Sequence, residues 1–297
     1  MTPQSLNYEK LNEIVELANY SDISSIGTVV SGIIRIINDP KSTIKDLKEI
    51  IQVDPPLTAR VLRLANSSYY SPPKSIGEIM QAIIWVGYDA IKELAMSQKV
   101  CKIFDKDEYI EGYSRKSLWK HSLAVALLAK MVYRKEFGER GENIYASGLL
   151  HDFGFIVLDQ FCQEDFSKIL GKSKEEEKNV GCTEDEVLGF NHGDLGMAIV
   201  ESWNIPEDIT MAIGNHHKPQ GTSQGFNRMV YTLYAADYFC QEKGIGYGDA
   251  PYGDRGIFHD CLSKLGLGRD ALELIMKDVE SEMTKMEDQG FFSDGQS

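Results

Sequence analysis

Apolar residues recur at helical spacing along nearly the whole chain, and alternating strand patterns are hard to find. One such stripe runs from Ile26 to Ile37 and stops at Pro40. Further short helical units, closed by proline or glycine, continue to Val100. Because an amphipathic helix must bury its apolar stripe against another element, this pattern predicts helix packed on helix. We therefore predict an all-α fold, with the three tryptophans as core anchors.

The helical pattern changes character at a charged stretch over residues 105–108. Helices become longer after it: residues 118–137 form an amphipathic pattern, and residues 144–161 are apolar nearly all round. Thr183 and Glu186 have the spacing of a capping box, which predicts a helix start ahead of His192. We predict two lobes: an N-terminal helical lobe over residues 1–104, and a helical bundle over residues 105–297 that ends in a glycine-rich tail and a last helix.

Composition restricts the partners of the chain. Its 297 residues, 42% of them hydrophobic, suffice for real cores, whereas a formal net charge of -14 argues against a nucleic-acid or anionic-membrane partner. The five cysteines form no Cys-x-x-Cys pair, which is typical of reduced thiols. The start of the chain lacks a signal-peptide pattern, and no apolar run approaches the ~18 residues of a membrane span. We expect a soluble cytoplasmic protein that binds neither nucleic acid nor membrane. The sequence does not determine its oligomeric state.

Five of the six histidines form an ordered series with two aspartates. The members are His121, His151, Asp152, His192, His216, His217 and Asp237. Imidazole and carboxylate are ligands of zinc, iron, nickel and manganese. A single histidine on an apolar helix is more often a hydrogen-bonded core residue than a ligand. The whole series, set in apolar helical stretches, favours one shared internal polar site; His259 lies outside it and is expected to be exposed.

The spacing within this series suits a pair of metal ions. His151 and Asp152 are adjacent and differ by about 100° around a helix, so they can offer donor atoms to one or two ions. Two ions about 3.5–4 Å apart would hold a phosphoryl group and lower the pKa of a bridging water. Asp237 shares a face with apolar residues, where a carboxylate is costly unless it is protonated, paired or bound to metal.

Several motifs resemble a known family. Residues 146–154, ASGLLHDFG, resemble the signature of the HD superfamily of metal-dependent phosphohydrolases. From about Ile26 onward, the chain is similar more narrowly to HDOD proteins, whose HD-related output domain occurs in bacterial signalling. That similarity rests on residues 54–67 (DPPLTARVLRLANS), 189–196 (GFNHGDLG) and 203–207 (WNIPE). The family is all-helical and acts mainly as a regulatory or scaffold module.

The resemblance implies a metal site and its ligands. In the core set of active HD enzymes, the matching residues are His121, His151, Asp152 and Asp237. In the two-metal members, the extra ligands correspond to His192, His216 and His217, with Asp152 as the bridge. The implied cofactor is one or two divalent transition-metal ions, with iron, manganese, nickel and zinc all open.

Two departures argue against cyclic di-GMP hydrolysis. The HD-type phosphodiesterases that cleave this dinucleotide carry a phosphate-binding lysine where this chain has Phe155, and an aromatic ring cannot neutralise a phosphate. They also follow the histidine pair with an acidic residue and Gly-Tyr-Pro, whereas this chain reads Lys218-Pro219-Gln220.

Three hypotheses remain. The first is a cytosolic bacterial signal-transduction output or regulatory module, with a metal-binding HD-type site, no efficient catalysis, and signalling proteins as partners. The second is a metal-dependent phosphohydrolase acting on a nucleotide or related phosphate ester, in which Asp152 would be the central catalytic group. The third is a structural polar core without metal.

Overall fold

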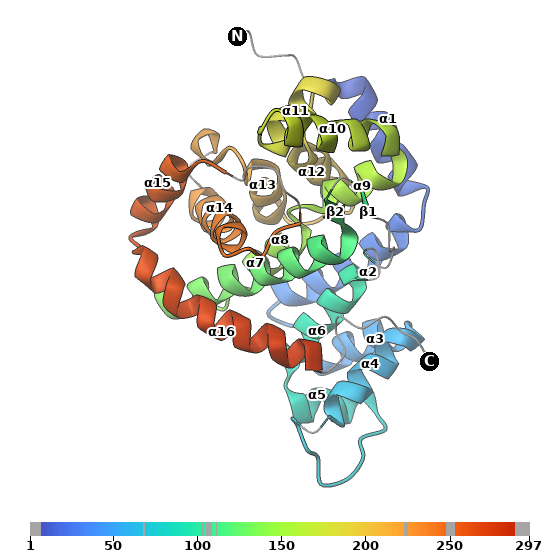
Figure 1. Ribbon diagram of the computed structural model, residues 1–297. Coiled ribbons are helices and arrows are strands. Elements are labelled where there is room, and N and C mark those ends of the chain that lie inside the picture. The colour runs from blue at the N-terminus through green and yellow to red at the C-terminus, as the bar shows by residue number, and fades with distance from the viewer. Residues whose placement is uncertain are drawn as a thin grey trace.

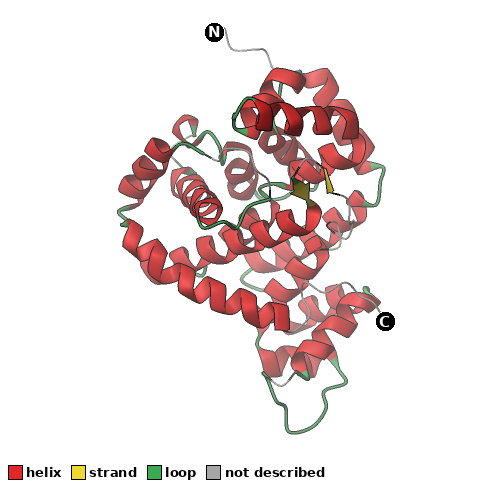
Figure 2. Cartoon of the chain, viewed as in Figure 1, coloured by secondary structure: helices red, strands yellow, loops and turns green. Residues whose placement is uncertain are grey.

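A computed structural model describes residues 7–67, 69–101, 104, 109–110, 112–222, 225–247 and 253–288. Helices make up almost all of the described chain (Figures 1 and 2). The strands within it are β1 (Tyr109–Ile110) and β2 (Tyr113–Ser114), which pair antiparallel. The predicted all-α fold is confirmed. In the described residues, no helix is both long enough and apolar enough to cross a membrane.

The first half of the chain forms short helices closed by local caps. They are α1 (Tyr8–Asn19), α2 (Ile23–Asn38), α3 (Ile44–Gln52), α4 (Pro55–Ala65), α5 (Ile79–Val86) and α6 (Tyr88–Cys101). Asp54 caps α4 by accepting a hydrogen bond from the Leu57 N–H, and Pro55 follows at the first helical position. In Figure 1, α3, α4 and α5 lie together at one end of the molecule, and α2 and α6 lead from them into the rest.

The second half forms a bundle around the 22-residue helix α7 (Arg115–Glu136). Its other helices are α8 (Glu142–Leu150), α9 (Phe153–Phe161), α10 (Gln163–Glu175), α11 (Val180–Leu188), α12 (His192–Ser202), α13 (Glu207–Asn215), the 3-10 turn η2 (Pro219–Gly221), α14 (Asn227–Glu242), α15 (Arg255–Leu265) and α16 (Arg269–Asp288). Helix α7 packs on α8, α14 and α16, so its middle is enclosed by other helices.

The N-terminal helix α1 packs on α9 and α12 of the bundle, whereas α2 contacts α6 and α8. The chain therefore starts against the bundle with α1, and only afterwards forms the group of helices α3, α4 and α5. The predicted lobe boundary falls at Phe104, and the charged segment 105–108 lies outside the described residues. The division into lobes at this boundary stays a prediction.

The structure corrects three details of the sequence analysis. The apolar segment 144–161 is two helices, α8 and α9, with a turn at His151 and Asp152. Thr183 does not start a helix, because α11 already begins after its cap Asn179. Trp85 is 45% exposed, unlike the other two tryptophans, and its neighbour Ile84 is 67% exposed, so this part of α5 lies at the surface of the described structure.

The helix that begins at His192 has a different cap from the one that the sequence predicted. Asn191 accepts hydrogen bonds from the N–H groups of Gly193 and Asp194, and the Asp194 carboxylate accepts one from the Asn191 N–H. This reciprocal capping box starts α12 at His192. The cap thus fixes the backbone of a candidate ligand.

Candidate metal centre

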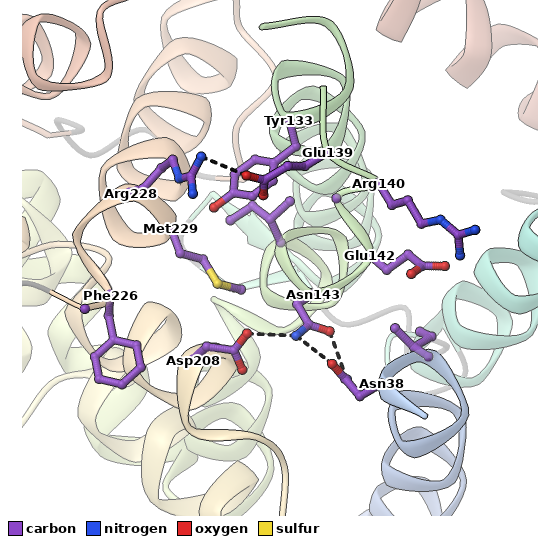
Figure 3. Close-up of a pocket in the computed structure, with 14 residues that line it drawn as sticks. Asn38, Tyr133, Glu139, Arg140, Glu142, Asn143, Asp208, Phe226, Arg228 and Met229 are labelled. Atoms are coloured by element: carbon purple, nitrogen blue, oxygen red, sulfur yellow. Dashed lines mark hydrogen bonds and ion pairs between the residues drawn. The ribbon is translucent and has the colours of Figure 1, made fainter. Parts of the chain in front are cut away.

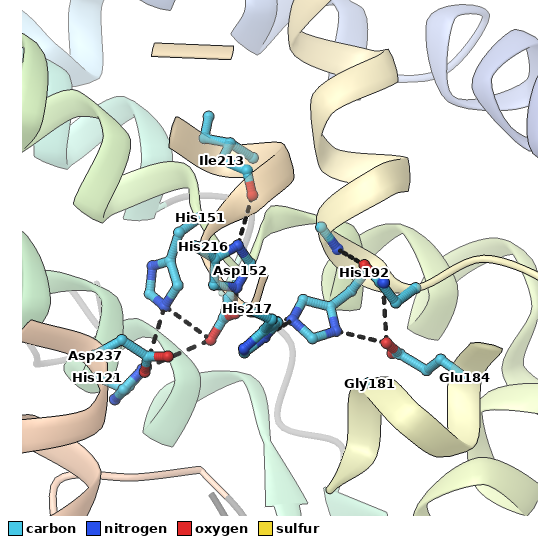
Figure 4. Close-up of polar contacts among 12 residues, drawn as sticks. His121, His151, Asp152, Gly181, Glu184, His192, Ile213, His216, His217 and Asp237 are labelled. Atoms are coloured by element: carbon cyan, nitrogen blue, oxygen red, sulfur yellow. Dashed lines mark hydrogen bonds and ion pairs between the residues drawn. The ribbon is translucent and has the colours of Figure 1, made fainter. Parts of the chain in front are cut away.

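Five segments of the bundle bring all seven predicted site residues together (Figure 4). His121 lies on α7, Asp237 lies on α14, and the remaining residues lie at helix ends. They divide into two groups, each with its donor atoms within 4.8 Å of one another: Asp152, His192, His216 and His217; and His121, His151 and Asp237. His259, which lies outside the series, is exposed as expected.

The Asp152 carboxylate lies between the two groups. Its Oδ2 atom is 3.2 Å from His151 Nε2 and 3.6 Å from His121 Nε2. Its Oδ1 atom faces the other group, at 3.3 Å from His192 Nε2 and 3.5 Å from His216 Nε2. One oxygen thus points to each group, as required of a carboxylate that bridges two ions.

Asp237 completes the group around His121. Its Oδ1 atom lies 3.0 Å from His121 Nε2 and 3.9 Å from His151 Nε2. The Gln241 side-chain amide donates a 2.6 Å hydrogen bond to the same oxygen from one helical turn later. The buried carboxylate that the sequence marked as an anomaly therefore has a defined orientation.

In four of the five histidines of the centre, the ring nitrogen Nδ1 lies at hydrogen-bond distance from an acceptor outside the two ligand groups. His121 Nδ1 lies 2.7 Å from the Ile245 carbonyl oxygen, and His151 Nδ1 lies 2.8 Å from that of Gly148. His216 Nδ1 lies 2.5 Å from the Ile213 carbonyl oxygen. A carbonyl can only accept, so Nδ1 carries the proton in these three rings and Nε2 offers a lone pair to the cluster.

Glu184 does the same for His192 and was not among the predicted site residues. Its Oε2 atom accepts hydrogen bonds from the His192 backbone N–H at 2.9 Å and from His192 Nδ1 at 2.6 Å. A carboxylate behind a ligand histidine fixes the ring and raises its basicity. Sequence spacing gave no sign of this contact, because Glu184 and His192 lie on different helices.

Several donor atoms at the centre have no partner in hydrogen-bond geometry. They are His121 Nε2, His151 Nε2, His216 Nε2 and both oxygens of Asp152. Buried polar atoms normally have a partner, and these five converge on common points although each is almost fully enclosed. Imidazole nitrogens and carboxylate oxygens form a donor set of the kind that transition-metal ions take. The residues present therefore fit such an ion.

The electrostatics of the group are strongly coupled. Burial would raise the pKa of Asp152, but His151, His192 and His216 outweigh it and hold that pKa well below its usual range. Burial would lower the pKa of His192, yet Glu184 and Asp152 raise it to about 10. Burial and two neighbouring histidines lower the pKa of His217 well below its usual value. The centre thus holds concentrated charge that an ion can compensate.

Aromatic rings pack against the ligand histidines of the centre. Phe155 is fully buried and stacks on His192 with ring centroids 3.8 Å apart. Tyr247, a further residue that sequence reasoning missed, packs 5.1 Å from both His121 and Phe155. Burial and the carboxylates of Asp152 and Asp237 raise the pKa of Tyr247 well above its usual value, so its hydroxyl stays protonated. Phe155 therefore supports a candidate ligand from the position where a phosphate-binding lysine stands in related enzymes.

Gly154 permits the close approach of α9 to α12. A Cβ atom at this position would overlap the carbonyl oxygen of His192. Only glycine leaves room for the two backbones to touch, which places His192 opposite Asp152. The last residue of the HD-like motif thus has a packing role in the centre.

Comparison with known proteins places this geometry in a family. The model of the HDOD domain matches residues 23–219. An HDOD domain protein with unknown function from Geobacter sulfurreducens is 25% identical, with a TM-score of 0.74 over 97% of this chain and 99% of that one. The chain is 23% identical over 233 residues to an uncharacterized protein of Treponema pallidum, of whose length it spans 44%.

Two further solved structures share the fold. One, from Marinobacter aquaeolei VT8, has a name that proposes a role in signal transduction; it is 21% identical, with a TM-score of 0.73 over 97% of this chain and 66% of that one. Another, from Shewanella amazonensis SB2B, has a name that proposes phosphohydrolase activity; it is 20% identical, with a TM-score of 0.68 over 95% of this chain and 96% of that one. Since the family model covers about two thirds of the chain, the protein belongs to the HDOD family.

Proposed function

We propose that this protein is a regulatory module of bacterial signal transduction whose centre binds one or two divalent transition-metal ions and catalyses little or no hydrolysis. The observation that carries the proposal is the convergence of unpartnered nitrogen and oxygen atoms around Asp152. Iron, manganese, nickel and zinc all suit these donors. The ligands are His121, His151, Asp152, His192, His216, His217 and Asp237.

The centre connects helices that are far apart in sequence. When bound, the metal would supply positive charge and a cross-link between α7, α14 and the ends of α8, α12 and α13. Glu184 holds the His192 ring, and the Ile245 carbonyl holds the His121 ring, before any ion arrives. Binding of the metal ion would then change the stability of the helical bundle. Partner signalling proteins in the cytoplasm would respond to this change.

The surroundings of the centre disfavour efficient phosphate hydrolysis. Charge that develops on a phosphate in the transition state must be met by preorganised donors. Phe155 offers an apolar ring at the position of the missing lysine. Lys218, the cation that follows the histidine pair, is 63% exposed and pairs with Asp185 at 3.0 Å. The rings of Phe155 and Tyr247, with centroids 5.1 Å apart, add apolar surface beside the centre and no charge for a phosphate.

The alternative function is a metal-dependent phosphohydrolase acting on a nucleotide or related phosphate ester. The placement of Asp152 favours it, because one oxygen faces each ligand group as in a two-metal site. In that case Asp152 would hold both ions, and a small phosphate ester would suit the centre better than cyclic di-GMP.

Metal content and stability separate the two metal-binding hypotheses from the structural polar core. We expect elemental analysis of the purified protein to find one or two transition-metal ions per chain. A ligand at 100 to 1,000 times its dissociation constant stabilises the native state by about 3–4 kcal/mol, so a chelator should lower the melting temperature. Asp152→Ala should abolish this shift, whereas Asp260→Ala, on the surface helix α15, should retain it.

Activity assays provide the second arm. The metal-loaded protein should leave cyclic di-GMP intact and turn over a generic aryl phosphate slowly or not at all. Strong cleavage of either substrate that disappears in Asp152→Ala would place the enzyme first. A metal-free protein whose stability does not change on reconstitution would leave the structural polar core as the explanation.

A further inference from the structure

A cavity of about 350 Å³ lies at the ends of the metal-centre helices that point away from the centre (Figure 3). Four helices contribute both to its lining and to the centre. Tyr133 on α7, Ile144 on α8, Asp208 on α13 and Met229 on α14 line the cavity. Each lies seven to twelve residues from a candidate ligand on the same helix or at its end, about 10–18 Å along the axis. Asn38, at the end of α2, adds a wall from the first half of the chain.

The polar floor of the cavity is a row of three side chains. Asn38 and Asn143 exchange two hydrogen bonds of 3.0 Å, and Asn143 Nδ2 donates a further one of 2.7 Å to Asp208 Oδ2. Asn38 Nδ2 also donates to the Ile34 carbonyl oxygen at 2.9 Å. Both hydrogens of each amide are therefore used, one of them on the Ile34 carbonyl and the others within the row. The remaining hydrogen-bonding capacity of the floor is that of acceptors.

Asp208 has a different charge environment from the other two acids at the cavity. Glu139 pairs with Arg228 at 2.9 Å, and Glu142 pairs with Lys92 at 2.5 Å. The hydrogen-bond donors that the structure describes for Asp208 are the Asn143 amide and the Ile209 N–H at 3.0 Å, both uncharged. The start of α13 accommodates an acid at this position, but the carboxylate keeps accessible lone pairs beside the cavity.

Part of the wall beside Asp208 is apolar and aromatic. Phe226 lies on one side of Asp208 in Figure 3, and Met229 lies above it. Aromatic rings and methionine sulfur both favour contact with a flat or cationic group. The Arg228 guanidinium is engaged by Glu139 and lies over the Tyr133 ring, 5.9 Å from its centroid.

We infer that this cavity is a binding site for a small organic cation, in which an ammonium, amidinium or guanidinium group donates to Asp208 and an apolar body packs on Phe226 and Met229. A volume of about 350 Å³ lies at the lower end of the range for small-molecule sites. The site is separate from the metal centre, because none of the candidate ligands lines the cavity.

Three compounds of nearly identical shape test the charge of the ligand. Isothermal titration of the protein with benzamidine, benzamide and benzoate compares a cation, a neutral molecule and an anion. We expect benzamidine to bind once per chain, at least about tenfold more tightly than the other two, because its amidinium makes charge-assisted hydrogen bonds. Equal or tighter binding of benzoate would identify an anion site formed by Arg140, Arg228 and the nearby helix starts, and would overturn the proposal.

Two variants locate the binding. Asp208→Asn keeps an oxygen that accepts from Asn143 but removes the charge, so benzamidine affinity should fall by about tenfold to a hundredfold. Glu207→Gln removes an exposed charge from the adjacent residue, which does not line the cavity, and should leave the affinity unchanged. Absence of benzamidine binding to the parent protein, or undiminished binding to Asp208→Asn, would reject the site.

Discussion

His192 is the most constrained ligand candidate, because a carboxylate lies on each side of its ring. Glu184 accepts from Nδ1 at 2.6 Å, and Asp152 lies 3.3 Å from Nε2. Removing a carboxylate behind a ligand histidine typically weakens metal binding by about 10–100-fold. We predict a loss of this size in Glu184→Gln, measured by competition with a chelator of known affinity. Glu186→Gln, an exposed change on the same helix, should match the parent protein, and equal affinities of both variants would contradict a supporting role for Glu184.

The same residue predicts a pH dependence of the metal-free protein. The pKa of His192 is raised from 6.5 to about 10 in the folded state, so the folded protein binds the proton more tightly than the unfolded chain. The associated stability is complete below pH 6.5 and is lost as the pH rises toward 10. Urea denaturation of chelated protein should show a free energy of unfolding that falls between pH 7 and 9. His192→Gln should fall less steeply over this interval; an identical slope would show that another group titrates.

The residues of the centre differed in how far the sequence could predict them. The five histidines and two aspartates could be proposed because ionisable side chains stand out within apolar helical patterns. Glu184 and Tyr247 gave no such signal. The first lies within residues 183–186, whose spacing predicts only a capping box, and the second lies in a glycine-rich stretch without periodicity. Both reach the centre through tertiary packing, and the spacing of residues along the sequence does not reveal such contacts.

At the scale of elements, the end of α14 sets the position of His121. Gly244 adopts a left-handed conformation with φ of +77°, and the N–H of Ile245 then bonds back to the Cys240 carbonyl at 2.9 Å. This turn brings the Ile245 carbonyl to His121 Nδ1. Gly244→Ala should destabilise the protein by about 1 kcal/mol, because a Cβ disfavours this conformation, and should weaken metal binding.

Gly246→Ala is the matched control, since a Cβ at either glycine would meet open space and Gly246 has no positive φ. Thermal denaturation with and without metal distinguishes the two. If both alanine variants retain full stability and metal affinity, the turn does not position the ligand.

The break between α8 and α9 shows why element boundaries were harder to predict than elements. Residues 144–161 are apolar on all sides, so no change of periodicity marks the turn. The break occurs where Asp152 leaves helical geometry with φ of -97° and ψ of 13°. At that turn the side chains of His151 and Asp152 both point to the centre, whereas on one continuous helix they would differ by about 100°. The break is therefore explained by the geometry of the site and by the packing of Gly154 against α12, neither of which appears in the periodicity of the segment.

For the whole molecule, periodicity was sufficient for the all-α class, because helical stripes recur along the chain and alternating strand patterns are hard to find. It was not sufficient for the order of packing. Helix α1 joins the bundle through α9 and α12, more than 130 residues later in the chain. Such contacts depend on the shapes of the assembled surfaces, and a lone apolar face on α1 does not specify its partner.

The cavity and the metal centre lie at opposite ends of the same four helices, so we predict that they are coupled. The carboxylates of Asp152 and Asp237 repel each other electrostatically. We expect an ion between them to hold the helix ends that carry the ligands more firmly than the metal-free centre does. A ligand in the cavity would then have to order these helices, and that cost reduces its affinity. Benzamidine should therefore bind more tightly to the metal-loaded protein than to the chelated protein in parallel titrations. Linkage requires that benzamidine, in turn, raises the metal affinity by the same factor. In Asp208→Asn the chelator competition should become insensitive to benzamidine, and a benzamidine affinity that is the same with and without metal would show that the two ends of the bundle act independently.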